Sequence, residues 1–166
     1  AYTLTLPIEW VRKNKLDIGV STILTQVLVS SKDKAFENPT KFVGPFYTKK
    51  EAEKLKKRFI IKEDSGRGYR RVVPSPKPIE IIESDIIKKL LSLNVVVIAS
   101  GGGGIPVIKE NNKLVGVEAV IDKDSASSCL ANSINAEVLI MITDIDRVYL
   151  NFRKKNQKGL NKVKLK

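Results

Sequence analysis

The sequence has no histidine, only one cysteine and no long apolar segment. Without histidine, this chain cannot form a Ser-His-Asp triad or a His-ligated metal site from its own residues. A single cysteine, Cys129, excludes an internal disulfide. No apolar run approaches the roughly 20 residues that span a bilayer, and no signal-peptide pattern opens the sequence. These absences favour a cytoplasmic protein without a membrane partner.

Positive charge is abundant, with a formal net charge of +12 over 166 residues. Much of the excess lies in the last 14 residues, which contain no acid and seven basic residues: Arg153, Lys154, Lys155, Lys158, Lys162, Lys164 and Lys166. A short basic end is usually a solvated surface, so nucleic-acid binding is the less favoured interpretation.

The order of predicted elements indicates one α/β domain. Thr48, with Glu51 three residues later, has the capping-box pattern of a helix start. Two continuous apolar segments, Val95–Ala99 and Val138–Ile142, are typical of strands covered on both faces. The predicted elements are, in order, a strand at 20–29, a loop at 30–47, a helix from 48, strands at 59–62 and 69–73, a proline-rich loop at 74–78, a helix capped by Ser84, a strand at 95–99, a hairpin at 106–120, a helix from 122–124 and a strand at 138–142. The helix after Ser84 is expected to face inward with Ile86, Ile87, Leu90 and Leu91, and the helix from 122–124 with Ala126, Cys129, Leu130 and Ile134.

The strongest local signal is the glycine run that follows the apolar strand 95–99. It comprises Ser100, Gly101, Gly102, Gly103 and Gly104. Ligands of open α/β sheets bind beyond the carboxyl ends of the strands, and glycines there let backbone N–H groups approach an anion. The pattern favours an anion site over a flexible loop, although it is neither a Walker A loop nor a dinucleotide fingerprint.

Three other segments carry candidate polar chemistry, each with a simpler alternative. Lys123, flanked by two aspartates at a predicted helix start, can orient an ammonium toward a phosphoryl group, but this pattern is more often a helix cap with a surface lysine. Thr143, Asp144 and Asp146 end an apolar strand and suit either a nucleotide contact or a simple turn. The arginines between Asp64 and Arg71 suit either a phosphate clamp or local ion pairs.

Taken in order, five segments resemble the successive signatures of carbamate kinases, in the amino-acid kinase superfamily. They are NPTKFVGPFY (Asn38–Tyr47), DSGRGYRRVVPSPKP (Asp64–Pro78), IASGGGGIPV (Ile98–Val107), GVEAVIDKD (Gly116–Asp124) and LIMITDID (Leu139–Asp146). The likeness extends from about Val20 to about Leu160, which is most of the chain.

The resemblance implies an open αβα sandwich with a mainly parallel sheet, forming a homodimer, with a small protruding subdomain at about residues 38–71. It also implies reversible phosphoryl transfer between ATP and carbamate, with ADP, carbamoyl phosphate and Mg²⁺, in fermentative arginine breakdown. By resemblance, Lys41 and Lys123 are catalytic lysines, and Asp124 organises them. Ser100 and Gly101–Gly104 would contact the carbamate and phosphoryl groups, Thr143, Asp144 and Asp146 the nucleotide, and no protein side chain is assigned to a metal.

The sequence also departs from the family pattern. Members are nearly twice as long, and their opening G-G-N turn and closing P-G-S-M-x-P-K segment have no counterpart here. The resemblance therefore implies a partial domain truncated at both ends. Arg147 stands where the family usually has glycine, and Phe42 where proline is common. The alternative to an enzyme is a non-catalytic remnant that keeps the fold, a ligand site or a dimer surface.

Overall fold

The computed structural model describes residues 2–152 and 154–164. Ala1, Arg153, Leu165 and Lys166, including two of the seven basic residues noted above, lie outside the described residues. The elements are α1 (Tyr2–Lys13), β1 (Gly19–Thr22), β2 (Gln26–Val29), β3 (Lys41–Tyr47), α2 (Lys49–Leu55), β4 (Ile61–Glu63), β5 (Tyr69–Val73), β6 (Pro78–Ile81), α3 (Ser84–Ser92), β7 (Val95–Ile98), the 3₁₀ turn η1 (Gly101–Gly103), β8 (Ile105–Glu110), β9 (Lys113–Gly116), α4 (Lys123–Ser133), β10 (Val148–Leu150) and β11 (Lys158–Leu160).

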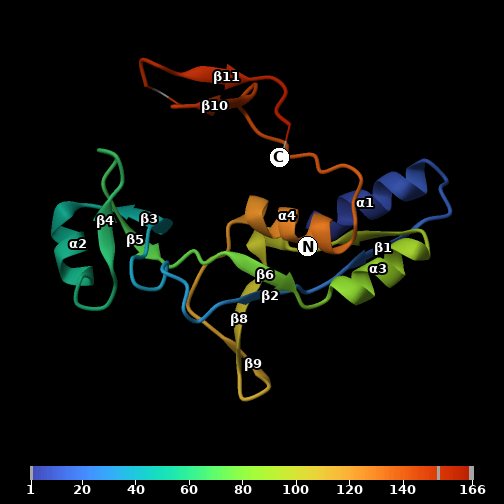
Figure 1. The fold of residues 1–166 in the computed structure, drawn as a ribbon, viewed down its shortest axis with the longest axis horizontal. Helices are drawn as coiled ribbons and strands as arrows, with labels where there is room; N and C mark the ends of the chain where they lie inside the picture. Colours follow the sequence, from blue (N-terminus) through green and yellow to red (C-terminus); the bar gives the residue numbers. More distant parts are fainter. Residues whose placement is uncertain (1, 153, 165–166) are drawn as a thin grey trace.

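The predicted α/β class is confirmed, and the core lies beside a four-stranded sheet of order β6-β2-β8-β9 (Figure 1). Strand β2 pairs parallel with β8, whereas β6 and β9 join antiparallel. Helix α4 packs on β6. The buried core cluster contains residues of β2, β6 and β8, one residue each of α3 and α4, and Ile121, which precedes α4. Its members are Val27, Val29, Ile81, Ile87, Ile108, Ile121 and Ala126.

A second sheet contains only β1 and β7, which pair parallel from Gly19–Val95 to Thr22–Ile98. The sequence predicts one strand at 20–29, but the structure divides it at Ile23–Thr25. There the chain passes from one sheet to the other, since the Thr25 carbonyl accepts from Ile105 N–H and the Thr25 hydroxyl accepts from Ser100 N–H.

The third sheet, of order β3-β5-β4, carries α2 and lies apart from the core (Figure 1, left). Its predicted capping box is present, with Thr48 Oγ1 accepting from Glu51 N–H and Glu51 accepting from Thr48 N–H. The prediction of a loop over 30–47 is wrong at its end, because β3 pairs with β5 there. Pro45 is tolerated at a position where the β3–β5 register is interrupted, between Val43 and Tyr47.

The starts of β6 and α3 differ from the sequence predictions. Strand β6 begins at Pro78, which starts the strand as prolines commonly do, so the proline segment is not wholly irregular. Helix α3 is not capped by the Ser84 side chain. Its N-cap is Glu83, whose carboxylate accepts from the backbone and side chain of Gln26 at 2.7 and 2.9 Å. Of the apolar residues expected to face inward in α3, only Ile87 is buried, and Ile86 and Leu91 are exposed.

The predicted strand at 138–142 is absent from the structure. No described strand pairs with this segment, and Val138 and Ile142 are 73% and 94% exposed. A strand is stable only with a hydrogen-bonding neighbour, which an apolar sequence does not itself provide. The strand at 95–99 is confirmed as β7, but Val96 is 43% exposed, so β7 is not covered on both faces.

The last two strands, β10 and β11, form a hairpin that stands away from the other sheets (Figure 1, top). At the other end, α1 includes Pro7 and packs on β1. None of the described helices has the length and apolarity that crossing a membrane requires.

Candidate functional site

The start of α4 is the point at which several predicted site residues meet. Asp122 is the N-cap, and its Oδ1 accepts from the backbone N–H groups of Asp124 and Ser125, each at 3.1 Å. This cap makes Lys123 and Asp124 the first two residues of the helix. The helix predicted to begin at 122–124 is therefore confirmed, with Ala126 buried and three other expected inner residues packed against the core: Cys129, Leu130 and Ile134.

Lys41 reaches this helix start from the first residue of β3. Its Nζ lies 2.9 Å from Asp122 Oδ2, although the two residues are 81 positions apart in sequence. The hydrogen bond from Lys41, and then the one from Ser125 N–H, holds the pKa of Asp122 below its ordinary value. From the sequence, Asp122 is one of two aspartates at an expected helix cap, which the structure confirms. Its contact with Lys41 has no signal in the sequence.

A second contact joins the same two regions. Arg71 of β5 forms an ion pair with Glu118, in the segment that leads to α4. The backbone N–H of Val120 also donates to the Pro74 carbonyl at 2.9 Å. The small sheet is therefore tied to the approach to α4 at more than one point.

The glycine run packs against the residue before the α4 cap. A Cβ on Gly103 would lie 2.2 Å from the Ile121 carbonyl oxygen, and Gly103 has a φ of +107°. A Cβ on Gly104 would lie 2.6 Å from Val27. These two glycines are thus required by close packing, whereas nothing lies within 4 Å of a Cβ on Gly101 or Gly102. The open half of the turn is the half available to a ligand.

Ser100 precedes these glycines in a left-handed conformation, with a φ of 54°. It is buried, and its hydroxyl has no hydrogen-bond partner among the described residues. Buried polar groups are usually paired, so this hydroxyl is free to donate to an acceptor brought to the turn.

A cavity of about 560 Å³ brings the α4 start together with the segment after 138–142. Lys123 and Asp124 line it on one side, and Thr143 and Asp146 on the other. Asp144 is not part of the lining, and it accepts from the Thr143 hydroxyl at 3.4 Å. Lys41 and the glycine run do not line this cavity either, so the predicted site residues form two neighbouring groups that meet at the start of α4.

Asp146 is held by its own neighbours. Tyr149 Oη donates to Asp146 at 2.7 Å, and Arg147 Nε donates to it at 2.6 Å. Both hydrogen bonds lower the pKa of Asp146, and the bond from Tyr149 has the larger effect. Arg147 also donates to Asn161 Oδ1 at 2.9 Å. Because the backbone of Arg147 is not left-handed, the arginine at the usual glycine position is accommodated without strain.

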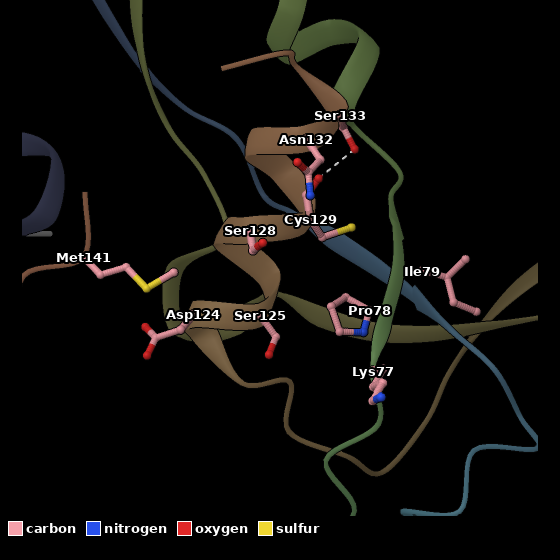
Figure 2. Close-up of a pocket in the computed structure, with 10 residues that line it drawn as sticks. All are labelled: Lys77, Pro78, Ile79, Asp124, Ser125, Ser128, Cys129, Asn132, Ser133 and Met141. Carbon is pink, nitrogen blue, oxygen red and sulfur yellow. Dashed lines mark hydrogen bonds between the residues drawn. The ribbon is translucent and has the colours of Figure 1, made fainter. Parts of the chain in front are cut away.

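A larger cavity, of about 690 Å³, lies between α4 and β6 (Figure 2). Asp124 and Met141 line both cavities. The remaining walls are the serine-rich face of α4, the first residues of β6, and Lys77, which precedes β6. Burial raises the pKa of the Cys129 thiol in this wall, which makes the thiolate a minor form.

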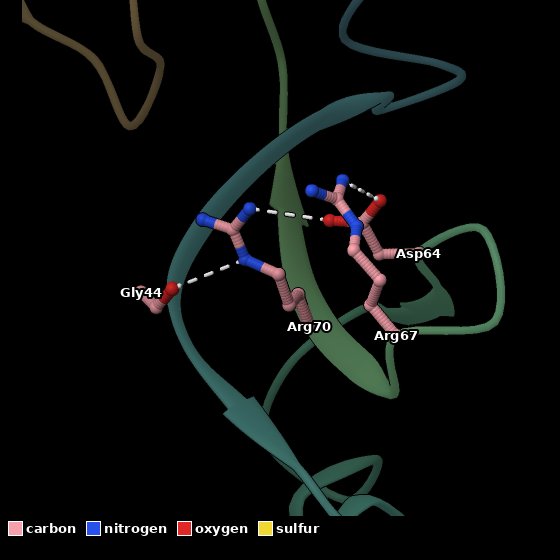
Figure 3. A network of polar contacts seen from close by, with 4 residues as sticks. All are labelled: Gly44, Asp64, Arg67 and Arg70. Atoms are coloured by element: carbon pink, nitrogen blue, oxygen red, sulfur yellow. Dashed lines mark hydrogen bonds and ion pairs between the residues drawn. The ribbon is translucent and has the colours of Figure 1, made fainter.

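The arginines of the 64–71 segment serve a buried carboxylate. The Asp64 side chain is only 5% exposed, and it accepts from Arg67 at 2.8 Å and from Arg70 at 3.2 Å (Figure 3). Arg70 also donates to the Gly44 carbonyl. The hydrogen bond from Arg67 is the largest of the effects that lower the pKa of Asp64. Of the two interpretations of this segment, the structure contains the local ion pairs.

The described residues contain no group of three or more His, Cys, Asp or Glu side chains placed to hold a metal ion. The charged groups at the α4 start are instead two lysines and two aspartates. These four charges sum to zero, and Lys41 is paired with Asp122, so an anion there would depend on the ammonium groups and backbone N–H groups that face it.

Comparison with known proteins assigns the family. The sequence model of the amino acid kinase family matches residues 11–165. The chain belongs to the amino acid kinase family. Among curated relatives, carbamate kinase 3 of Staphylococcus aureus is 55% identical over 150 residues, which cover 89% of this chain and 48% of that protein. The carbamate kinase of Latilactobacillus sakei is 52% identical over 160 residues, covering 93% and 50%.

Solved structures of this family share the fold. The carbamate kinase from Giardia lamblia bound to AMP-PNP superposes with a TM-score of 0.77 at 46% identity, over 92% of this chain and 49% of that one. The same enzyme bound to citric acid gives a TM-score of 0.78 at 47% identity, over 87% and 48%. The chain spans about half the length of the curated relatives it matches.

Proposed function

We propose that this chain serves carbamate kinase chemistry, the reversible transfer of a phosphoryl group between ATP and carbamate. The observation that carries the proposal is the 2.9 Å contact between Lys41 and Asp122, which brings Lys41 to the helix start that bears Lys123 and Asp124. Three relatives that match about 90% of the chain at 50–55% identity are named carbamate kinases.

The chemistry suits these residues. Phosphoryl transfer requires positioning and neutralisation of charge more than a nucleophilic side chain. In the proposal, Lys41 and Lys123 neutralise charge on the transferring group, and Asp124 orients the lysines. Ser100 and the open glycines Gly101 and Gly102 bind carbamate or the phosphoryl oxygens through N–H and O–H groups. Gly103 and Gly104 give the turn its shape.

The nucleotide side of the site is proposed to be the 560 Å³ cavity. Thr143 and Asp146, with the neighbouring Asp144, would contact ATP or ADP there. Mg²⁺ would enter with the nucleotide, since this ion commonly binds through substrate phosphates and one or two carboxylates, and it would supply charge neutralisation at the β- and γ-phosphates. The Giardia lamblia carbamate kinase bound to AMP-PNP supports a nucleotide as a ligand of this fold.

A second candidate function is a non-catalytic protein that keeps the phosphoryl-anion site. One specific observation favours it: the predicted nucleotide residues follow a segment that is exposed and unpaired in the described structure. Asp146, moreover, is already engaged by Arg147 and Tyr149. In this version Lys41, Lys123 and the glycine run bind the anion without transferring it.

ATP formation from ADP and carbamoyl phosphate with Mg²⁺ separates the two candidates, measured beside Lys123→Ala. Turnover that Lys123→Ala reduces by about 10²-fold or more supports the enzyme, because removing one positioned charge costs this much in preorganised sites. Binding of carbamoyl phosphate without turnover supports the second candidate. Equal background rates and no binding in either protein would contradict both.

We also propose for this chain four properties that the resemblance to carbamate kinases implies. These are a homodimer, a role in arginine breakdown, a cytoplasmic location and a protruding subdomain at residues 38–71 within one partial domain. The dimer is tested by the molar mass in solution, measured by light scattering over a range of protein concentrations. A monomer at all concentrations would contradict that part of the proposal.

A further inference from the structure

We infer that Asp122 is a positioning residue, which fixes Lys41 relative to the start of α4 while it caps that helix. The inference rests on the proposed function for its catalytic meaning. It goes beyond that function by giving a role to a residue that the resemblance left without one. The geometry itself is independent of whether the chain transfers phosphate.

The two carboxylate oxygens of Asp122 have separate tasks. Oδ1 accepts the two backbone N–H groups that cap the helix, at Asp124 and Ser125. Oδ2 accepts from Lys41 Nζ at 2.9 Å. One rigid group therefore sets both the direction of the helix start and the place of the lysine. The backbone of Lys123 lies between Asp122 and the two residues whose N–H groups Asp122 caps, so it belongs to the same capped turn.

The ion pair is placed for geometry more than for stability. The Lys41 and Asp122 side chains are 38% and 42% exposed, and ion pairs this exposed contribute little to folding. A lysine side chain, however, has many rotamers, and holding its ammonium at one place removes that freedom before a substrate arrives. The other charged residues of the α4 start, Lys123 and Asp124, follow Asp122 directly in the chain.

A matched control exists in the second contact between the same regions. Arg71 and Glu118 tie β5 to the approach to α4 without touching Lys41 or the helix cap. If docking of the small sheet alone placed Lys41, breaking this second contact would disturb Lys41 as much as changing Asp122. If Asp122 is the positioning group, only the Asp122 change has this effect.

Asp122→Asn separates the two tasks. Asparagine caps helices as well as aspartate, so the α4 start is kept, while the charge that holds Lys41 is lost. The test measures the acylation rate of individual lysine amines with a water-soluble acylating reagent and peptide mass spectrometry, in the full chain without substrate. Lys62, whose Nζ is bonded to Asn38 and the Pro39 carbonyl, is the internal reference.

We expect the Lys41 rate, relative to that of Lys62, to rise about two- to fivefold in Asp122→Asn, the factor an exposed ion pair can supply. Glu118→Gln should leave this ratio unchanged. Asp122→Ala should raise it equally and also lower the Tm by about 2–4 °C, because it removes the cap as well. A ratio that is the same in wild type and Asp122→Asn, or that Glu118→Gln raises as much, would overturn the inference.

A kinetic readout applies if the wild-type chain forms ATP. Asp122→Asn should then lower kcat about tenfold with little change in KM, since a displaced lysine weakens the transition state more than ground-state binding. Glu118→Gln should change neither constant. Equal losses in kcat and in binding would contradict a positioning role. An inactive wild-type chain would contradict the enzyme proposal alone, and the labelling ratio would still decide the role of Asp122.

Discussion

The region around β2 and α4 differs sharply from the segment at 138–146, although both have apolar sequence next to predicted site residues. In the first region, Val27, Ile81 and Ala126 are fully buried, and the site residues are held by a helix cap, an ion pair and close glycine packing. In the second, Ile140 and Ile142 are 78% and 94% exposed, and the polar residues bond mainly to near neighbours in the chain.

The difference shows that apolar character alone does not make an element. β2 has neighbours on both sides, since β6 and β8 pair with it, and α4 lies against β6. The segment at 138–142 has the same β-branched composition but no strand partner within the described chain. The residues at the start of α4 are therefore fixed by packing, whereas residues 143–146, which follow the exposed segment, are not.

The largest contrast is expected from apolar truncation. Ile81→Ala should lower the free energy of unfolding by about 2–5 kcal/mol, because Ile81 is fully buried in the core cluster and its removal leaves a cavity. Ile142→Ala should change it by no more than about 0.5 kcal/mol. Urea unfolding followed by circular dichroism measures both. Comparable losses in the two variants would show that the 138–142 segment is packed in solution.

Glycine substitution should sharpen the comparison within the first region. Gly103→Ala should cost about 1–3 kcal/mol, since its Cβ would clash with the Ile121 carbonyl and its φ is +107°. Gly101→Ala meets nothing within 4 Å and should be close to neutral in stability. The same unfolding assay applies. A neutral Gly103→Ala would mean that the turn and Ile121 are not in contact.

Acid titration compares a buried and an exposed carboxylate. The pKa of Asp64 is lowered by Arg67 and Arg70, so its contribution to stability is present above the ordinary value of 3.8 and is lost as the pH falls through the folded-state pKa. Asp64→Asn should therefore destabilise the small sheet at pH 7 and flatten the loss of stability below about pH 4.

Asp146 also has a lowered pKa, but its side chain is 59% exposed, so solvent screens its pairs. Asp146→Asn should leave the Tm between pH 3 and pH 7 almost parallel to that of the wild type. Thermal unfolding across this pH range checks both variants. Parallel curves for Asp64→Asn would contradict the buried network of Figure 3.

The smallest effect on folding is expected from polar substitution of the exposed segment. Ile140→Ser with Ile142→Ser should change the free energy of unfolding by no more than about 0.5 kcal/mol, while it reduces self-association, because contiguous exposed apolar side chains promote it. Sedimentation velocity compares the proteins. Unchanged self-association would mean that another apolar surface is responsible, for example at Leu93 or Leu24, which are 72% and 77% exposed.

Much of the fold near the proposed site could be predicted from sequence because local signals specify it. The capping box at Thr48, the hairpin around residues 111–113 and the helix after Asp122 each depend on a few adjacent residues. The absence of a strand at 138–142 and the narrow buried face of α3 could not be predicted, because both depend on what packs against these segments. The break at Ile23–Thr25 depends on a long-range contact from Thr25 to Ser100.

The same distinction applies to the candidate site. Lys123, Asp124 and the glycine run could be proposed from motifs, and the structure places the glycine turn against the start of α4. The contact between Asp122 and Lys41 could not be predicted, because the two residues are remote in sequence. The position of Asp144 outside the cavity lining likewise follows from the conformation of the chain after residue 142, which no local pattern specifies.

The most direct test of the account is calorimetric titration with carbamoyl phosphate, comparing wild type with Lys123→Ala and Lys113→Ala. Lys113 is an exposed lysine at the start of β9, so its variant controls for simple attraction by the net charge of +12. We expect saturable binding to the wild type. Lys123→Ala should weaken it about tenfold or more, because one charge-assisted hydrogen bond is lost, and Lys113→Ala should leave the affinity unchanged. Equal affinity in all three proteins would contradict a phosphoryl-anion site at the start of α4.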